Sequence, residues 1–134
     1  METKSITPTY VTFAQSKLLK KKNFNVSTLN WYHNGTKKLN RNNLLCSMNK
    51  LTDNYSAPEQ WQVIEWFELA FKIYIDTKCV NSTRGDNFEY CIHKNNDTIK
   101  IKNGFNNRKE AYSAAIDYVL KVLLESSNSQ VNNF

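Results

Sequence analysis

The sequence predicts an α+β fold in which helices cover one face of a small antiparallel sheet of three to five strands. Three stretches place apolar residues at helical spacing, and the segment between the last two alternates apolar and polar residues as strands do. The predicted order is a helix, a weak hairpin, and then helix, three strands and helix. A chain of 134 residues is long enough for one domain, which we expect over residues 1–125, before a disordered tail over residues 126–134.

The first helix is predicted from about Thr12 to Lys22, after a loose N-terminus formed by residues 1–9. Its last turn holds three lysines, and cations at that end of a helix interact favourably with the helix dipole. Asn23 follows at the position where a left-handed residue ends many helices. Phe24 is therefore expected to fold back onto the helix.

A weak hairpin is predicted next. Residues 29–33 have the composition of a short strand, and Asn34 with Gly35 is typical of a type I′ turn, but the return arm over residues 36–39 has little strand character. Residues 40–55 are polar and rich in asparagine. We expect either a loop with one helical turn or a mobile segment there.

The densest apolar pattern lies over residues 56–80. The run from Ser56 to Glu59 has the form of a capping box, with Pro58 in the first turn, so a helix is predicted to begin there. After Phe71 the period changes to two, which predicts a strand over residues 73–80 and a tight joint between helix and strand. The apolar stripe of this helix consists of Val63, Ile64, Phe67, Ala70 and Phe71, widened by Trp66 and Leu69.

Two further strands and a helix are predicted in the C-terminal half. Residues 88–93 alternate as a strand, and an asparagine-rich turn separates them from a third strand over residues 98–102, which is expected to point Ile99 and Ile101 inward. A capping box that begins at Asn107 opens the last helix. The buried face of that helix is predicted to consist of Ala111, Tyr112, Ala115, Ile116, Val119, Val122 and Leu123.

The composition limits the class of protein. A formal charge of +6 permits a polyanionic partner, but 15 lysines against 3 arginines, together with 19 asparagines, indicate AT-rich coding as an alternative source of that charge. No stretch has the pattern of a signal peptide or of a membrane span. Three cysteines are an odd and small number for a disulfide framework. We therefore expect a cytoplasmic protein with no membrane partner.

Three blocks of the sequence together resemble a known family. The first has the sequence FAQSKLLKKKNF, from Phe13, and is followed by an aromatic pair at residues 31–32. The second is APEQ at residues 57–60, which opens a tryptophan-containing helix ending in IYI. The third is FEY at residues 88–90, followed by Glu110 and Ala111 in the last helix. Together the blocks extend over most of residues 10–123.

With these blocks, the chain resembles a group of small uncharacterised proteins encoded by gut Bacteroidota and their phages. The family commonly has A-P-T-Q before the middle helix and K-G-F after the first, where this chain has Glu59 and Asn23 instead of threonine and glycine. Both replacements suit the same local structure. The resemblance implies a similar fold and a phage or mobile-element setting in a bacterial host cell. It implies no activity and no catalytic residues.

Metal binding and catalysis have little support in the sequence. Cys79, Cys91 and His93 would approach one another if their strands pair, with Cys46 or His33 as a fourth ligand, but no C-x-x-C pair is present and such cysteines usually pack as small apolar residues. Glycine-rich phosphate loops and nucleophile motifs are also absent. We therefore expect no cofactor, no small-molecule substrate and no enzyme activity.

Nucleic-acid binding is the alternative function. The predicted order helix, three strands and helix is also that of the double-stranded-RNA-binding domain, in which a basic start of the last helix meets phosphates. Glu65 and Glu68 on the central helix, and Tyr112 where a lysine is expected, depart from that pattern. The candidate contacts for this function are Lys100, Lys102, Arg108 and Lys109.

Protein binding is the function that we prefer. Trp31, Trp61 and Tyr74 are large aromatic residues that the predicted core does not require, and such residues form the energetic centres of many interfaces. They would form a binding patch if two of them met at the surface. The sequence thus predicts a non-enzymatic accessory protein that binds another protein or itself.

Overall fold

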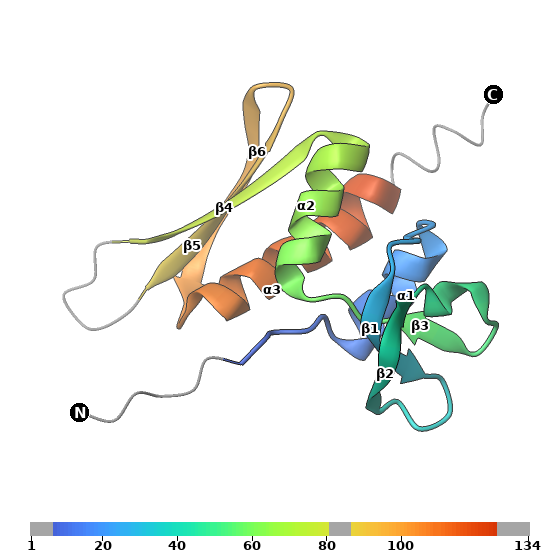
Figure 1. Cartoon of the computed structure of the whole chain (residues 1–134). Coiled ribbons are helices and arrows are strands. Elements are labelled where there is room, and N and C mark those ends of the chain that lie inside the picture. The colour runs from blue at the N-terminus through green and yellow to red at the C-terminus, as the bar shows by residue number, and fades with distance from the viewer. Residues whose placement is uncertain (1–6, 81–86, 126–134) are drawn as a thin grey trace, which may run out of the picture.

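Three helices and two three-stranded antiparallel sheets form the part of the chain that the computed structural model describes, residues 7–80 and 87–125 (Figure 1). This confirms the predicted α+β class and the order of its elements. The predicted tail, and residues 1–6 of the predicted loose N-terminus, lie outside the described residues. The helices are α1 (Phe13–Lys21), α2 (Gln60–Phe71) and α3 (Arg108–Tyr118), which a π-helical turn (Val119–Leu123) extends. The first sheet has the strand order β2-β1-β3 and consists of β1 (Thr28–His33), β2 (Leu39–Cys46) and β3 (Asn54–Ser56). The second sheet has the order β4-β5-β6 and consists of β4 (Ile73–Cys79), β5 (Phe88–Lys94) and β6 (Asp97–Phe105).

Helix α1 begins and ends as predicted. The Thr12 hydroxyl accepts the N–H of Gln15 at 3.1 Å, and the Gln15 side-chain oxygen accepts the N–H of Thr12 at 3.0 Å. At the other end, Asn23 has a φ of 65°, in the left-handed region. The N–H of Phe24 then donates to the carbonyl of Leu19 at 3.0 Å, which folds the Phe24 ring back into the core.

Strands occupy most of the segment that was predicted to be a loop over residues 40–55. That prediction is wrong, although one 3-10 turn (Met48–Lys50) does lie there. Asparagine has a low strand propensity, but β1 pairs with β2 on one edge and with β3 on the other, and this pairing overrides the propensity. The β1–β2 register is irregular. Asn30 pairs with Arg41 and Thr28 pairs with Cys46, so the four residues 42–45 bulge out opposite a single residue of β1.

The β1–β2 hairpin forms, but its turn is not the predicted type I′ turn at Asn34 and Gly35. The left-handed residue is Lys37, with a φ of 57°, and its N–H donates to the carbonyl of His33 at 2.8 Å. The His33 ring nitrogen Nδ1 accepts the N–H of Gly35 at 3.1 Å. These two hydrogen bonds favour a longer loop than a two-residue turn.

The second helix begins later than the capping box predicted. Ser56 ends β3, and its hydroxyl accepts the N–H of Met48 at 3.0 Å instead of capping a helix. Glu59 is the N-cap, and its N–H donates to the side-chain oxygen of Gln62 at 2.9 Å. Pairing of β3 with β1 therefore displaces the start of α2. The tight joint at the other end is confirmed, because the single residue Lys72, with a φ of 56°, connects α2 to β4.

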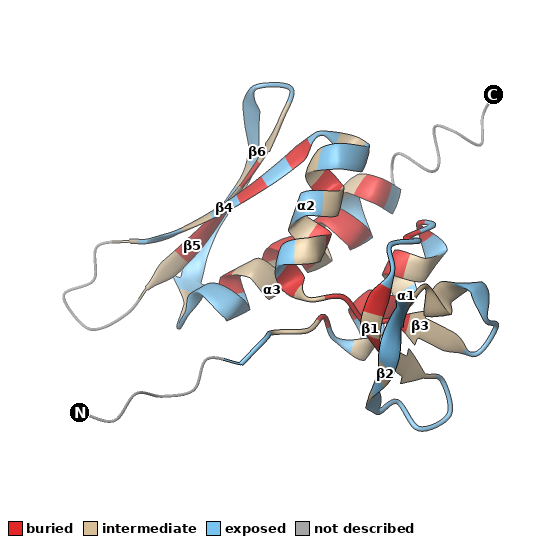
Figure 2. Cartoon of the chain, viewed as in Figure 1, coloured by how far each residue is buried: buried red, intermediate tan, exposed pale blue. Residues whose placement is uncertain are grey.

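Helices α2 and α3 lie together on one face of the β4-β5-β6 sheet, and the first sheet with α1 lies beyond them (Figure 1). Buried residues concentrate where these layers face each other (Figure 2). Ile73 and Ile75 of β4 point into this core, whereas Tyr74 between them is exposed. The other core residues are Val11, Leu19, Phe24, Val63, Phe67, Tyr90, Ile92, Ala111, Ala115, Ile116, Val119, Leu120 and Leu124.

The predicted orientation of β6 is wrong. Ile101 is 54% exposed and stands opposite Cys91, on the outer face of the sheet. Lys100 faces the helices instead, and its ammonium lies 5.4 Å from the centre of the Tyr118 ring. A lysine tolerates this position because its stem covers apolar surface while its charge stays at the edge. Ile99 forms a bulge, because Lys100 pairs with Ile92 while Thr98 pairs with His93. The alternation of apolar and polar residues in the sequence could not predict this bulge.

The end of α3 also differs from the predicted face. The π-helical turn adds one residue to the helical repeat, so Leu120 and Leu124, which were not predicted to be buried, are fully buried, while the predicted Leu123 is only partly buried against the core. Val122 is 43% exposed. The start of the helix is as predicted, because the Asn107 side chain accepts the N–H of Glu110 at 2.9 Å.

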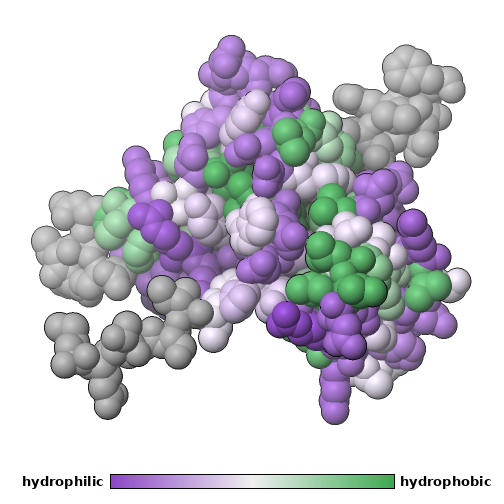
Figure 3. Space-filling model, viewed as in Figure 1, coloured by the Kyte–Doolittle hydropathy of each residue, from purple (hydrophilic) through white to green (hydrophobic). Residues whose placement is uncertain are grey.

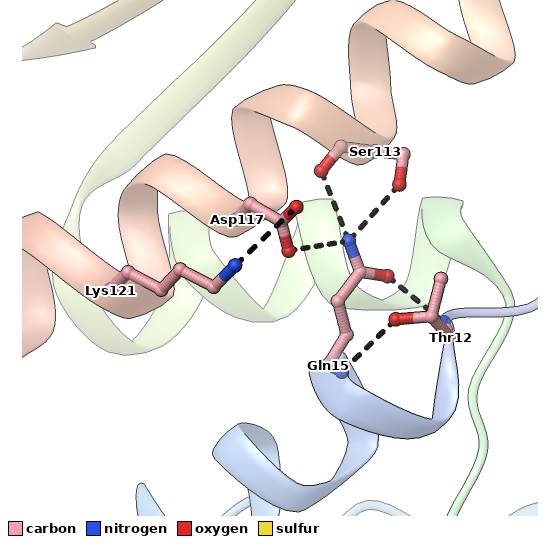
Figure 4. Close-up of polar contacts among 5 residues, drawn as sticks. All are labelled: Thr12, Gln15, Ser113, Asp117 and Lys121. Atoms are coloured by element: carbon pink, nitrogen blue, oxygen red, sulfur yellow. Dashed lines mark hydrogen bonds and ion pairs between the residues drawn. The ribbon is translucent and has the colours of Figure 1, made fainter.

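A buried glutamine connects α1 to α3 (Figure 4). The amide nitrogen of Gln15 lies 3.0 Å from the carbonyl oxygen of Ser113, 3.1 Å from its hydroxyl and 3.0 Å from Asp117 Oδ1. Its oxygen is already used by the N–H of Thr12. Every polar atom of this 1% exposed side chain therefore has a partner, and two segments about 100 residues apart are joined.

Candidate protein-binding surface

The three aromatic residues predicted for protein binding lie on different parts of the molecule. The Trp31 indole is half-buried on β1, and its N–H donates to Asn42 Oδ1 at 3.1 Å. Tyr74 is 44% exposed on the outer face of β4, away from the helices. Trp61 is 57% exposed in the first turn of α2, which covers the inner face. The structure therefore does not unite them in one patch, and only Trp61 borders a large hollow.

That hollow has a volume of about 550 Å³ and lies between α2, the start of α3 and the segment before α1. Hydrogen bonds hold these three pieces together at its base. Gln60 donates through its side-chain amide to the carbonyl of Lys109 at 3.1 Å, and through its N–H to the carbonyl of Thr9 at 2.8 Å. Ile64 and Tyr112 supply apolar and aromatic lining. We call this feature the α2–α3 hollow.

A smaller hollow of about 210 Å³ lies on the other side of Trp61, along α2. It is lined by Val26, Trp66 and Leu69 in addition to Trp61. Leu69 was predicted to widen the buried stripe, but it is 70% exposed, because the side of α2 that faces the core consists of Val63 and Phe67, with Ile64, Trp66 and Phe71 packed against it. Trp61 and Leu69 are eight residues apart and share a helix face. We call Val26, Trp61, Glu65, Glu68 and Leu69 the Trp61 surface.

The Trp61 surface is acidic in a chain that is otherwise basic. Glu65 and Glu68 line the α2–α3 hollow and have no ion-pair partner among residues 7–80 and 87–125. Spacings of four and seven residues place both carboxylates on the same side of α2 as Trp61. An exposed indole is thus flanked by two free negative charges.

The four lysine and arginine candidates for nucleic-acid contact have different roles. The Arg108 guanidinium donates to the carbonyl of Thr77 at 2.8 Å and to its hydroxyl at 2.9 Å, and it stacks 5.5 Å from the centre of the Phe88 ring. Lys100 covers Tyr118, at the far end of α3. The side chains of Lys102 and Lys109 have no acidic partner among the described residues.

The resulting surface differs from that of a double-stranded-RNA-binding domain, although the order of α2, β4, β5, β6 and α3 is the same. In that domain, the exposed side of the first helix enters a minor groove. Here the corresponding helix presents Glu65 and Glu68, which would face phosphates. The shared order alone is therefore weak support for RNA binding.

The predicted histidine and cysteine candidates do not come together. Cys91 and His93 lie on the open outer face of the second sheet, whereas Cys79 alternates onto the other side of β4, and Cys46 and His33 belong to the first sheet. His93 Nε2 is 3.3 Å from Asp76 Oδ2, and Nδ1 is 3.0 Å from the Thr98 hydroxyl, but the Asp76 side chain is 76% exposed. Cys91 shares this face, and burial together with a hydrogen bond to Glu89 raises the pKa of its thiol. Within the described ranges, no three His, Cys, Asp or Glu residues are grouped as metal ligands.

A second apolar feature lies on the first sheet. Leu44 is 78% exposed and Leu45 is 64% exposed, both within the β2 bulge. Figure 3 shows hydrophobic side chains gathered over β1 and β2, and others near α2. Leu45 lines a hollow of only about 110 Å³, which Glu59 also borders, so these leucines do not indicate the chemistry of a ligand. Among the described helices, none has both the length and the apolar character needed to cross a bilayer.

Comparison of the chain with protein-family models, with curated proteins and with solved structures finds no match.

Proposed function

We propose that this protein is a non-enzymatic accessory protein that binds another protein through the Trp61 surface. The observation that supports this most is the indole of Trp61, which is 57% exposed and separates two hollows. Tryptophan is enriched at the energetic centres of interfaces, because it buries a large rigid area with few rotatable bonds. Leu69 extends the apolar area along the same helix.

The charges of this surface favour a protein over a nucleic acid. Glu65 and Glu68 would repel phosphates, and Arg108 is already hydrogen-bonded to Thr77. The family resemblance supports a phage or mobile-element setting in the cytoplasm of a bacterial host. In that setting, the partner would be a host protein.

A pull-down from host lysate, with and without nuclease, tests the proposal. Trp61→Ala removes the indole, and Tyr74→Ala is the matched control because Tyr74 is an exposed aromatic on the opposite side of the sheet. We expect wild type and Tyr74→Ala to capture one protein that survives nuclease treatment and binds again when purified. Trp61→Ala should lose it. Capture that is unchanged in Trp61→Ala would contradict the proposal.

Self-association is the other form of this proposal, and sedimentation of the purified chain tests it. A dimer that dissociates on Trp61→Ala substitution would make a second copy the partner. A monomer at all concentrations would leave only a different protein as partner.

Nucleic-acid binding is a second candidate, favoured by the side chains of Lys102 and Lys109, which have no acidic partner in residues 7–80 and 87–125. It predicts a mobility shift of duplex RNA or DNA at about 50 mM salt that weakens steeply as salt rises. The double variant Lys102→Gln/Lys109→Gln should weaken this shift. No shift of either duplex at low salt would exclude this function.

A further inference from the structure

We infer that the partner inserts an arginine side chain into the α2–α3 hollow, between the face of Trp61 and the carboxylates of Glu65 and Glu68. This inference rests on the proposed function and specifies the chemistry of the partner. The occupant of the hollow is a positively charged segment of a partner protein.

The charge distribution around the hollow is the first reason. Three carboxylates line it, those of Glu59, Glu65 and Glu68, against the cations Arg108 and Lys109. The Arg108 guanidinium is turned toward Thr77, which leaves Lys109 as the available cation on the α3 side. A negative wall on α2 is complementary to a positively charged ligand.

The aromatic ring is the second reason. A guanidinium stacks on the face of an indole, and it binds carboxylates through paired N–H groups at the same time. Trp61, Glu65 and Glu68 follow one another at intervals of four and three residues, so their side chains lie in sequence along one side of α2. A lysine ammonium could pair with the carboxylates, but it lacks the planar shape that stacks on an indole and binds carboxylates through paired N–H groups.

The size and lining of the hollow are the third reason. Its volume of about 550 Å³ accommodates a long side chain together with part of its backbone. Ile64 and Tyr112 line the interior, where the apolar stem of an arginine would pack. Lys109 on the opposite wall would repel a guanidinium, which confines it to the α2 side.

The direct test is a titration of the isotope-labelled protein with N-acetyl-L-argininamide, monitored by NMR. N-acetyl-L-citrullinamide is the matched control ligand, because it has nearly the same shape and no charge. We expect a saturable shift of the Trp61 indole N–H signal, identified with Trp61→Phe, for the arginine compound and a much smaller shift for the citrulline compound. Equal responses to both compounds, or no response at Trp61, would overturn the inference.

Variants of the protein complete the test. Glu65→Gln/Glu68→Gln should weaken the arginine response about tenfold, since charge-assisted hydrogen bonds are lost. Asp53→Asn/Asp97→Asn removes the same number of charges from exposed positions elsewhere and should leave the response unchanged. Equal responses of the two double variants would show that only net charge matters and would contradict the inference.

The pull-down separates this inference from the proposed function. If Trp61→Ala loses the partner and Glu65→Gln/Glu68→Gln retains it, the proposed function stands and the arginine inference is wrong. If both variants retain the partner, the proposed function itself is wrong. Loss of the partner in both variants, together with the NMR response, supports both.

Discussion

The ammonium of Lys22 lies 2.9 Å from Oε2 of Glu125, although only 2% of the Lys22 side chain is exposed. The same ammonium also lies 3.4 Å from the carbonyl of Leu124. The residue that follows α1 is thereby joined to the last residue that the structure describes. A buried ammonium needs such partners, because its desolvation is otherwise uncompensated. The other two lysines attributed to the helix dipole have partners as well, because Lys21 lies 3.6 Å from Glu125 and Lys20 donates to the carbonyls of Thr52 and Asn54.

We expect Glu125→Ala to lower the free energy of unfolding, because it leaves the Lys22 ammonium without its carboxylate. Lys22→Met should cost less, since an apolar side chain of similar length needs no partner. Urea denaturation of both variants near neutral pH measures the difference. Equal unfolding midpoints for wild type and Glu125→Ala would contradict this role.

The pH dependence of the pair has a defined sign. The hydrogen bond from Lys22, and then the charge of Lys21, lower the pKa of the Glu125 carboxyl in the folded protein. Its contribution to stability is therefore present above the unfolded-state pKa of about 4.3 and is lost as the pH falls through the lower folded-state pKa. We expect the stability difference between wild type and Glu125→Ala to shrink progressively as the pH falls below the unfolded-state pKa. The effect is modest because solvent reaches the carboxylate.

Gln15 gives a second prediction, because its amide group joins α1 to α3. Replacement with leucine should lower the free energy of unfolding by about 1–3 kcal/mol, since the N–H of Thr12 and Oδ1 of Asp117 each lose a hydrogen bond. Gln15→Glu should be worse, because it places a second carboxylate beside Asp117. Ser113→Ala is the control, because it removes one of the three acceptors. If Gln15→Glu proved as stable as wild type, the amide contacts would not matter.

Local chemistry explains which elements the sequence could predict. Thr12 and Asn23 delimit α1, and Asn107 starts α3, because the capping hydrogen bonds involve neighbours in the chain. Ser56 looked equally suitable as a cap, but it lies in a strand whose partner, β1, is more than 20 residues away in the chain. Strand pairing between residues so far apart in the chain leaves no pattern in the sequence around Ser56.

The candidate site could be predicted only in part, for a related reason. Trp61 stood out because it lies at the polar edge of its helix. The α2–α3 hollow requires the start of α3, which lies beside Gln60 in space but 49 positions away in the chain. The exposure of Leu69 likewise depends on how α2 is rotated against the sheet. Helical periodicity narrows that rotation but does not determine it.

Lys72 gives a prediction about the joint between α2 and β4. Its φ of 56° is unfavourable for a residue with a side chain but not for glycine. We therefore expect Lys72→Gly to raise the free energy of unfolding by about 0.5–1 kcal/mol. Lys72→Ala, which removes the same charge without relieving the backbone, should not. Guanidinium denaturation compares the two, and equal stabilities would contradict the explanation.

The cysteines are expected to differ in reactivity. Cys79 is exposed, whereas burial and the hydrogen bond to Glu89 raise the pKa of the Cys91 thiol, so fewer thiolates form at a given pH. Iodoacetamide should modify Cys79 several-fold faster than Cys91, with single serine variants assigning the two rates. Glu89→Gln should lower the pKa of Cys91 and speed its modification. Glu68→Gln, on the other side of the sheet, serves as the unchanged control.

The Trp61 surface should be dispensable for folding, which is the property that separates a binding patch from a core. Leu69→Gln is expected to change the free energy of unfolding by no more than about 0.5 kcal/mol, because that side chain is 70% exposed. Trp61→Ala should cost about 1 kcal/mol or less, since part of the indole still contacts the helix. Phe67→Ala, one fully buried position on the same helix, should cost about 3–5 kcal/mol.

Urea denaturation of the three α2 variants tests this ranking. If Trp61→Ala destabilised the protein as much as Phe67→Ala, loss of partner binding in that variant would reflect unfolding and not the loss of a contact. Leu69→Gln would then be the decisive variant for binding. Its side chain borders only the smaller hollow, and we expect it to weaken partner binding without changing the NMR response to N-acetyl-L-argininamide.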